Sequence, residues 1–179
     1  MVDLFAFCRL VLAFTFLAAV YGAVRDWTGF QYSANRLWGE HGRVPRGVLR
    51  TVALVEAATA GLLLLPERLP VEIAATVAAL FLVAFTVLLA RVLVQGRDGI
   101  NCHCFGVKAE EVSGASVARN SIFLAMAVAS ASGAFIGVPL GDRMQTLLVW
   151  AGPAVATSLM LANANLVVRM VRRPPRFVS

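Results

Sequence analysis

The residues of this chain best suited to chemistry are two cysteines one residue apart, Cys102 and Cys104, with His103 between them. Two thiols at this spacing can cycle as a redox pair, and a disulfide across one residue closes a small, strained and easily reduced ring. The same thiolates, with the imidazole, can hold a metal ion such as Cu(I), Hg(II) or Zn²⁺. Flanking glycines, Gly99 and Gly106, allow the tight backbone path that either site needs. The spacing therefore predicts a thiol–disulfide pair or, alternatively, a soft-metal site.

Membrane helices must position these thiols, because the chain is too apolar for a water-soluble domain. Hydrophobic residues make up 59% of its 179 residues and the mean hydropathy is +0.78, whereas soluble domains average about 45–50% apolar residues. The composition predicts an all-α polytopic protein, with residues 1–179 forming a single integral membrane domain in a lipid bilayer. The net charge of +6 comes from arginines beside apolar runs, so we expect no nucleic-acid partner.

Five apolar stretches reach the length of about 17–25 residues that a spanning helix needs. Five crossings place two long connections, Arg25–Gly47 and Gln95–Ser116, on one side of the membrane with the C-terminal tail. Aromatic and polar residues mix in the first connection, which predicts a short interfacial helix, capped by Thr28 and ended by Gly39, that anchors the bundle. The stretches predict a four-helix transmembrane bundle plus a fifth transmembrane helix, over residues 4–24, 48–65, 71–94, 117–137 and 144–170.

The distribution of basic residues predicts the orientation in the cell membrane. Of the 16 lysines and arginines, 13 lie on the side of the long connections and three on the other. The positive-inside rule then places the N-terminus outside, and the C-terminus and the cysteine loop in the cytoplasm. Cytosolic thiols are normally kept reduced. This orientation and a simple disulfide-forming role therefore conflict, and one of the two predictions must change.

Polar residues at the start of two spans complete the candidate site. Glu56 lies about two turns inside the second span, and an ionisable residue in a membrane helix is costly enough to suggest a function. Arg119 and Asn120 begin the fourth span on the same side as the cysteine pair. We predict that Glu56 pairs with Arg119 or hydrogen-bonds to the backbone of the cysteine loop. A purely structural polar contact is the equal alternative.

Two further features are assigned to packing. Cys8 lies near the opposite end of the first span, too far from the pair for direct exchange across about 30 Å of bilayer. Gly133 and Gly137 form a G-x-x-x-G pattern, which is typical of a close helix contact.

The segment Cys102-His103-Cys104-Phe105-Gly106 resembles the C-x-C-F-G signature of the MauE family, membrane proteins of methylamine utilisation related to the DoxX-like group. Arg25-Asp26 with Phe30, Glu56, and Arg119-Asn120 are similar to further positions of that family. This sequence lacks the lysine that often precedes the Arg-Asp pair in the family. The resemblance covers most of the chain, roughly from Leu4 to Gly137.

The resemblance implies a four-helix bundle similar to DoxX and to vitamin K epoxide reductase-like membrane oxidoreductases. It also implies thiol–disulfide chemistry in the maturation of exported proteins, beside a thioredoxin-like partner. Our first hypothesis is therefore a membrane thiol–disulfide oxidoreductase or its accessory, with a quinone as a candidate cofactor. Alternatives are a soft-metal binding or transfer protein and a non-catalytic subunit of a larger membrane complex. The candidate site residues are Cys102, Cys104, Glu56, Arg119 and Asn120, or Cys102, His103 and Cys104 for a metal.

Overall fold

The structure, a computed structural model, describes residues 2–38, 43–65, 67–96, 101–102, 110–136 and 143–162. Almost all of these residues are helical, so the predicted all-α architecture is confirmed. A short antiparallel pair, β1 (Asn101–Cys102) and β2 (Glu110–Glu111), is the remaining regular structure in these ranges. The helices are α1 (Val2–Arg25), α2 (Trp27–Trp38), α3 (Arg46–Leu64), α4 (Arg68–Val94), α5 (Gly114–Ile136) and α6 (Arg143–Ala162).

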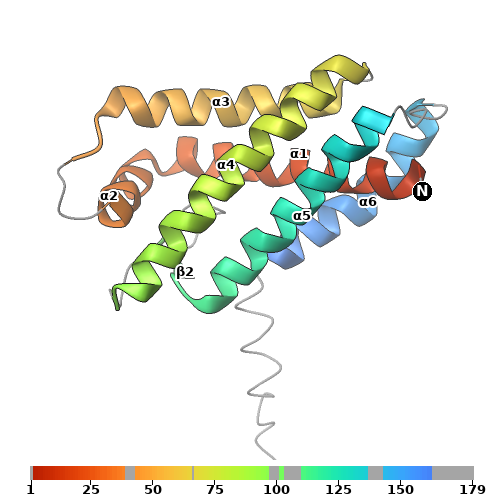
Figure 1. Cartoon of the computed structure of the whole chain (residues 1–179). Helices are drawn as coiled ribbons and strands as arrows, with labels where there is room; N and C mark the ends of the chain where they lie inside the picture. The colour runs from red at the N-terminus through yellow and green to blue at the C-terminus, as the bar shows by residue number, and fades with distance from the viewer. Residues whose placement is uncertain are drawn as a thin grey trace, which may run out of the picture.

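Helix α1 is the centre of the bundle. Four consecutive residues, Leu10, Val11, Leu12 and Ala13, are all between 0% and 3% exposed. Over this turn α1 is buried on every face, so it must be surrounded there by other elements, and α3, α5 and α6 all pack against α1 (Figure 1). This placement explains why the first apolar stretch of the sequence shows no polar face.

Helix α4 packs against α5 through small side chains. Ala74, Ala75 and Ala78 are at most 1% exposed, and small residues let two membrane helices approach closely. The opposite face of α4 presents Leu80 and Val87, which are 67% and 60% exposed. Large apolar side chains on an outer helix face are suited to contact with lipid chains.

Three helices are long and apolar enough to cross a membrane within the described residues, over Leu4–Arg25, Arg46–Leu64 and Leu69–Val94. The chain is therefore a membrane protein. Helices α5 and α6 have 23 and 20 residues, which correspond to about 34 and 30 Å and match the hydrocarbon thickness of about 30 Å. The predicted total of five spans stays a prediction.

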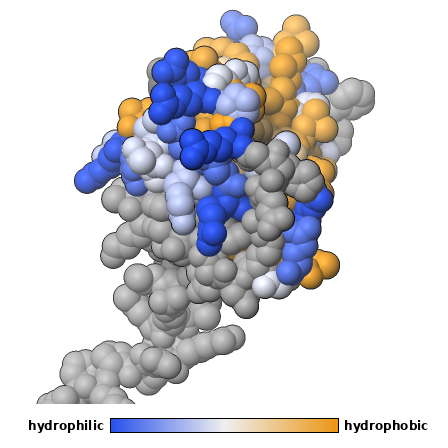
Figure 2. Space-filling model, turned by 90° about the vertical axis from the view of Figure 1, so that its left-hand side faces the viewer, coloured by the Kyte–Doolittle hydropathy of each residue, from blue (hydrophilic) through white to orange (hydrophobic). Residues whose placement is uncertain are grey.

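One end of the bundle collects the long connections. The end of α1, all of α2, the start of α3, the end of α4 and the start of α5 lie there, opposite the N-terminus (Figure 1). Figure 2 looks onto this end and shows hydrophilic residues gathered over it. Arginines beside interfacial aromatic rings mark a membrane surface. The exposed arginines from these elements include Arg25, Arg36, Arg43, Arg46 and Arg50.

At the other end, Arg9 of α1 closes the C-terminus of α3. Its guanidinium is buried, and it donates hydrogen bonds from Nε to the Leu63 carbonyl and from Nη2 to the Leu65 carbonyl, the latter at 2.7 Å. The last carbonyls of a helix lack partners within the helix and carry partial negative charge. Arg9 therefore supplies both hydrogen bonds and charge where α3 ends. From the sequence, Arg9 is only an interruption of the first apolar stretch.

The two packing predictions agree with the structure. Cys8 is buried in α1. A Cβ atom added to Gly133 of α5 would lie 2.5 Å from Cδ1 of Phe5 in α1, so the predicted close helix contact is confirmed at this glycine. Gly137 lies outside the described residues.

Candidate functional site

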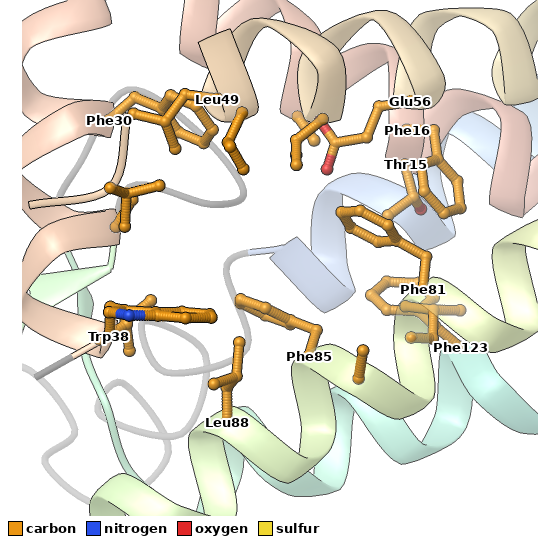
Figure 3. Close-up of a pocket in the computed structure, with 18 of the residues that line it drawn as sticks. Thr15, Phe16, Phe30, Trp38, Leu49, Glu56, Phe81, Phe85, Leu88 and Phe123 are labelled. Carbon is orange, nitrogen blue, oxygen red and sulfur yellow. The ribbon is translucent and has the colours of Figure 1, made fainter. Parts of the chain in front are cut away.

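An apolar cavity of about 220 Å³ lies among α1, α2, α3, α4 and α5. Leu12 and Phe123 at its inner end are fully buried, whereas Trp38 and Val48 at its outer end are 56% and 51% exposed. The cavity therefore runs from the core of the bundle to its surface (Figure 3). We call it the aromatic cavity, because six of the residues that line it are aromatic: Phe16, Phe30, Trp38, Phe81, Phe85 and Phe123.

Glu56 is the only ionisable residue among the described residues that line this cavity. Its side chain is 8% exposed and projects from α3 into the cavity, beside Thr15 and Phe16 (Figure 3). The Thr15 hydroxyl donates a hydrogen bond of 2.7 Å to the Val11 carbonyl of its own helix, so it is already satisfied. Among the residues that the structure describes, the Glu56 carboxyl is thus the one charged or strongly polar group available to a molecule in the cavity.

The predicted ion pair between Glu56 and Arg119 is not formed. No hydrogen bond or ion pair joins the Glu56 carboxyl to any residue that the structure describes. Arg119 is buried on α5 and is not among the residues that line the cavity, whereas Phe123, one turn further along the same helix face, is. An isolated carboxyl in apolar surroundings is costly. This cost is unusual for a group with only a structural role.

Asn120 makes its contacts with α4 instead of with Glu56. It is completely buried, and its Nδ2 donates hydrogen bonds to the Leu82 carbonyl, at 2.9 Å, and to Thr86 Oγ1. Leu82 lines the aromatic cavity. Asn120 therefore fixes α5 to the helix that forms one wall of the cavity. Its Oδ1 is a buried acceptor with no hydrogen-bond partner in the described structure.

Helix α2 covers the aromatic cavity, and Asp26 determines where it begins. The Asp26 carboxylate accepts a hydrogen bond of 2.9 Å from the Gly29 N–H, which is the usual contact of an N-cap residue. The prediction that Thr28 caps this helix is therefore wrong. Asp26 follows directly after α1, so it caps α2 as soon as the chain turns.

Two contacts hold α2 over the cavity. Asn35 Oδ1 accepts a hydrogen bond of 2.7 Å from the Val44 N–H, which ties the chain before α3 back to α2. Leu37 packs against Leu89 and Val92 of α4. The predicted short helix is thus present, and its position in the membrane interface stays a prediction; its aromatic residues Phe30 and Trp38 belong to the cavity wall. They are more than a membrane anchor.

The strand that carries Cys102 packs against the same helix. Strand β1 contacts α2, and its backbone pairing sets Cys102 opposite Glu110 of β2. Val112, just after β2, joins the apolar cluster of Leu37, Leu89 and Val92. The backbone of Cys102 therefore lies against the helix that covers the Glu56 cavity. His103 and Cys104 lie outside the described residues, as does the side chain of Cys102.

Comparison with known proteins assigns the chain to a family. The sequence profile of the family "Methylamine utilisation protein MauE" matches residues 1–133. The chain belongs to the MauE family. The match extends from α1 into α5, so it includes Cys102, Cys104, Glu56, Arg119 and Asn120, and it ends before α6.

A MauE relative supports the same assignment. The "Methylamine utilization protein MauE" of Paracoccus denitrificans is 35% identical over 144 residues, which cover 73% of this chain and 70% of the relative. No solved structure matches the chain. The family resemblance predicted from the sequence is therefore confirmed.

Three positions on which the resemblance was based have contacts that the structure describes. The Arg25 Nη1 donates a hydrogen bond of 3.1 Å to the Tyr21 hydroxyl, at the point where α1 ends. Asp26 caps α2, and Phe30 lines the cavity. The sequence analysis missed the cavity itself. The pair Phe81 and Phe85, one helical turn apart on α4, was the available sign of an aromatic wall.

Proposed function

We propose that this MauE family member is a membrane thiol–disulfide redox protein in which Cys102 and Cys104 cycle between dithiol and disulfide. One observation carries the proposal: β1, which holds Cys102, packs against α2, and α2 covers the cavity that contains the isolated Glu56 carboxyl. The name of the Paracoccus relative suggests that this chemistry serves methylamine utilisation.

The chemistry is an exchange of disulfides with a partner protein. A partner thiolate attacks one sulfur of the Cys102–Cys104 disulfide and forms a mixed disulfide, and the second partner thiolate then displaces the pair as a dithiol. The partner is oxidised by two electrons and the pair is reduced by two. Strain in the small ring favours this direction, which oxidises the partner. A thioredoxin-like protein is a suitable partner, because it presents such a dithiol.

The other candidate residues have supporting roles in this proposal. The Glu56 carboxyl transfers a proton and forms a hydrogen bond within the cavity. Asn120 is a positioning residue, since its contacts with Leu82 and Thr86 fix the cavity wall. Arg119, buried beside it, has the same assignment.

Mass measurement after thiol alkylation tests the proposal. In a Cys8→Ser background, unreduced protein should carry no alkyl adduct on Cys102 and Cys104, and reduced protein should carry two. A Cys102→Ser variant should carry one adduct on Cys104 under both conditions. Two adducts before reduction, together with one bound Cu(I) or Zn²⁺ ion that Cys102→Ser removes, would support the soft-metal alternative instead.

Complementation adds a physiological test. The chain is expressed in Paracoccus denitrificans lacking its own MauE, with methylamine as the growth substrate. Wild-type chain and Cys8→Ser should restore growth, and Cys102→Ser and Cys104→Ser should not. Growth restored equally by all four, at equal membrane levels, would contradict a redox role for the pair.

A further inference from the structure

We propose that the aromatic cavity binds the head group of a lipid-soluble quinone, with the Glu56 carboxyl hydrogen-bonded to one ring oxygen. The physiological purpose of this site rests on the proposed thiol–disulfide function. The binding itself rests only on the described residues of the cavity.

The size and walls of the cavity fit one substituted ring. Its volume is about 220 Å³, and apolar cavities of about 150 Å³ in other proteins accept benzene. Flat rings stack or meet edge to face with aromatic side chains. Phe81 and Phe85 of α4 face Phe30 and Trp38 of α2 across the space that such a ring would occupy (Figure 3).

The polarity of the cavity selects a ligand with a hydrogen-bonding edge. A purely hydrocarbon chain would leave the Glu56 carboxyl without a partner, which costs about 1–3 kcal/mol for a buried polar group. A water-soluble polar ligand would lose its other hydrogen bonds to apolar walls. A quinone meets both conditions, because its ring is apolar on the faces and carries carbonyl oxygens at the edge.

The residues around the outer end of the cavity are suited to access from the lipid. Ala84 and Leu88 line its wall on α4, and the adjacent Val83 and Val87 are 44% and 60% exposed. Together with the exposed Trp38 and Val48, they make the outer end of the cavity apolar. A ligand dissolved in the bilayer can enter there without crossing water.

The number of cysteines indicates why the thiol pair would need a quinone. The sequence has three cysteines, and Cys8, the one outside the pair, is buried in the N-terminal half of α1. No second thiol pair within this chain can therefore pass on the electrons of Cys102 and Cys104. A quinone can: two thiols and one quinone yield one disulfide and one quinol, with two electrons and two protons transferred. The quinol then returns to the bilayer.

Tryptophan fluorescence tests the binding directly. The protein is placed in lipid nanodiscs with Trp27→Phe and Trp150→Phe, so that Trp38 in the cavity wall is the sole fluorophore, and with Cys102→Ser and Cys104→Ser. A short-tailed ubiquinone should quench this fluorescence saturably. The Kd should rise at least tenfold in Glu56→Leu, which removes the hydrogen bond, and in Ala34→Phe, which fills the cavity. Glu72→Gln, an acid of α4 outside the cavity, should change Kd by less than twofold.

A further variant and two competitors complete the test. Glu56→Gln keeps a neutral donor and should bind within about threefold of the parent, which separates lost binding from failed folding of Glu56→Leu. Quenching that does not saturate, or that Ala34→Phe leaves unchanged, would overturn the proposal. Equal displacement by decane, or displacement by methylammonium, would also overturn it in favour of an acyl chain or a cation. Because the cysteines are absent, a failure here is distinct from a failure of the thiol chemistry.

Discussion

The side-chain amide of Asn120 donates a 2.9 Å hydrogen bond to the backbone carbonyl of Leu82. This bond joins α5 to α4 directly behind the wall of the aromatic cavity, because Leu82 is also a lining residue. Asn120, which the sequence suggests as a site residue, thus contacts α4 and does not line the cavity itself.

Replacing Asn120 with Leu should weaken the contact between α4 and α5. Interhelical hydrogen bonds in membrane proteins contribute on average about 0.6 kcal/mol and up to about 1.7 kcal/mol, so we expect a loss near the upper value for a residue with two such bonds. The measurement is reversible unfolding in mixed micelles. Ser132→Ala is the control, since that exposed hydroxyl bonds only to Val128 of its own helix. Equal stability of the two variants would contradict the assignment.

Arg9→Met should destabilise the protein by removing both donors at the end of α3. Each carbonyl left buried without a partner costs about 1–3 kcal/mol. The exposed Arg50 provides a matched control, and Arg50→Met should change the free energy of unfolding by less than about 0.5 kcal/mol. If both arginine variants unfold at the same denaturant concentration, Arg9 does not stabilise α3.

A methyl group at position 133 should force α1 and α5 apart. Gly133→Ala meets the ring of Phe5, and overpacking of this kind costs about 1–3 kcal/mol. Gly61→Ala, where the structure shows no heavy atom within 4 Å of the new Cβ, should instead stabilise α3 by up to about 1 kcal/mol. Thermal unfolding in detergent compares the two. Phe5→Leu should restore part of the stability lost in Gly133→Ala, and the absence of any rescue would argue against this contact.

The cysteine loop should be inaccessible from outside the cell. Because cytosolic thiols are kept reduced, the disulfide-forming role is compatible with this orientation only if the proposed quinone reoxidises the pair, so the role is not a simple disulfide exchange. The exposed arginines lie at the end of the bundle that carries β1, which supports a cytoplasmic position. After reduction of the membranes, a membrane-impermeant maleimide should therefore label Cys102 and Cys104 in inverted membrane vesicles and leave them unlabelled in intact cells. A cysteine introduced beside Arg68, in the opposite connection, should show the reverse pattern. Labelling of the pair in intact cells would reverse the orientation.

The sequence predicts the helices well, because span length and apolar content are local properties. The helices begin and end within a few residues of the predicted ranges as far as the described residues extend. The N-cap residue of α2 was harder to predict, since Asp26 and Thr28 are both good N-cap residues. Asp26 is the cap because α1 ends at Arg25, so that α2 begins directly after Asp26.

Contacts between distant residues could not be predicted in this way. Arg9 bonds to backbone carbonyls more than 50 positions later, and any residue type offers such a carbonyl. Charge complementarity suggested a pair between Glu56 and Arg119, but in the bundle Phe123, one turn after Arg119 on α5, lines the cavity and Arg119 does not. The cavity itself depends on where α2 packs, which is a property of the whole bundle.

Substitution of Glu56 tests most directly whether its carboxyl has a functional role or only a structural one. The measurement is the rate at which a short-tailed ubiquinone oxidises the reduced Cys102–Cys104 pair in Glu56→Gln, alongside its thermal unfolding midpoint. We predict that oxidation slows at least tenfold while the midpoint is unchanged or higher, since a buried carboxyl without a partner does not stabilise the fold. A lower midpoint with an unchanged oxidation rate would contradict the account and show that Glu56 is a structural contact.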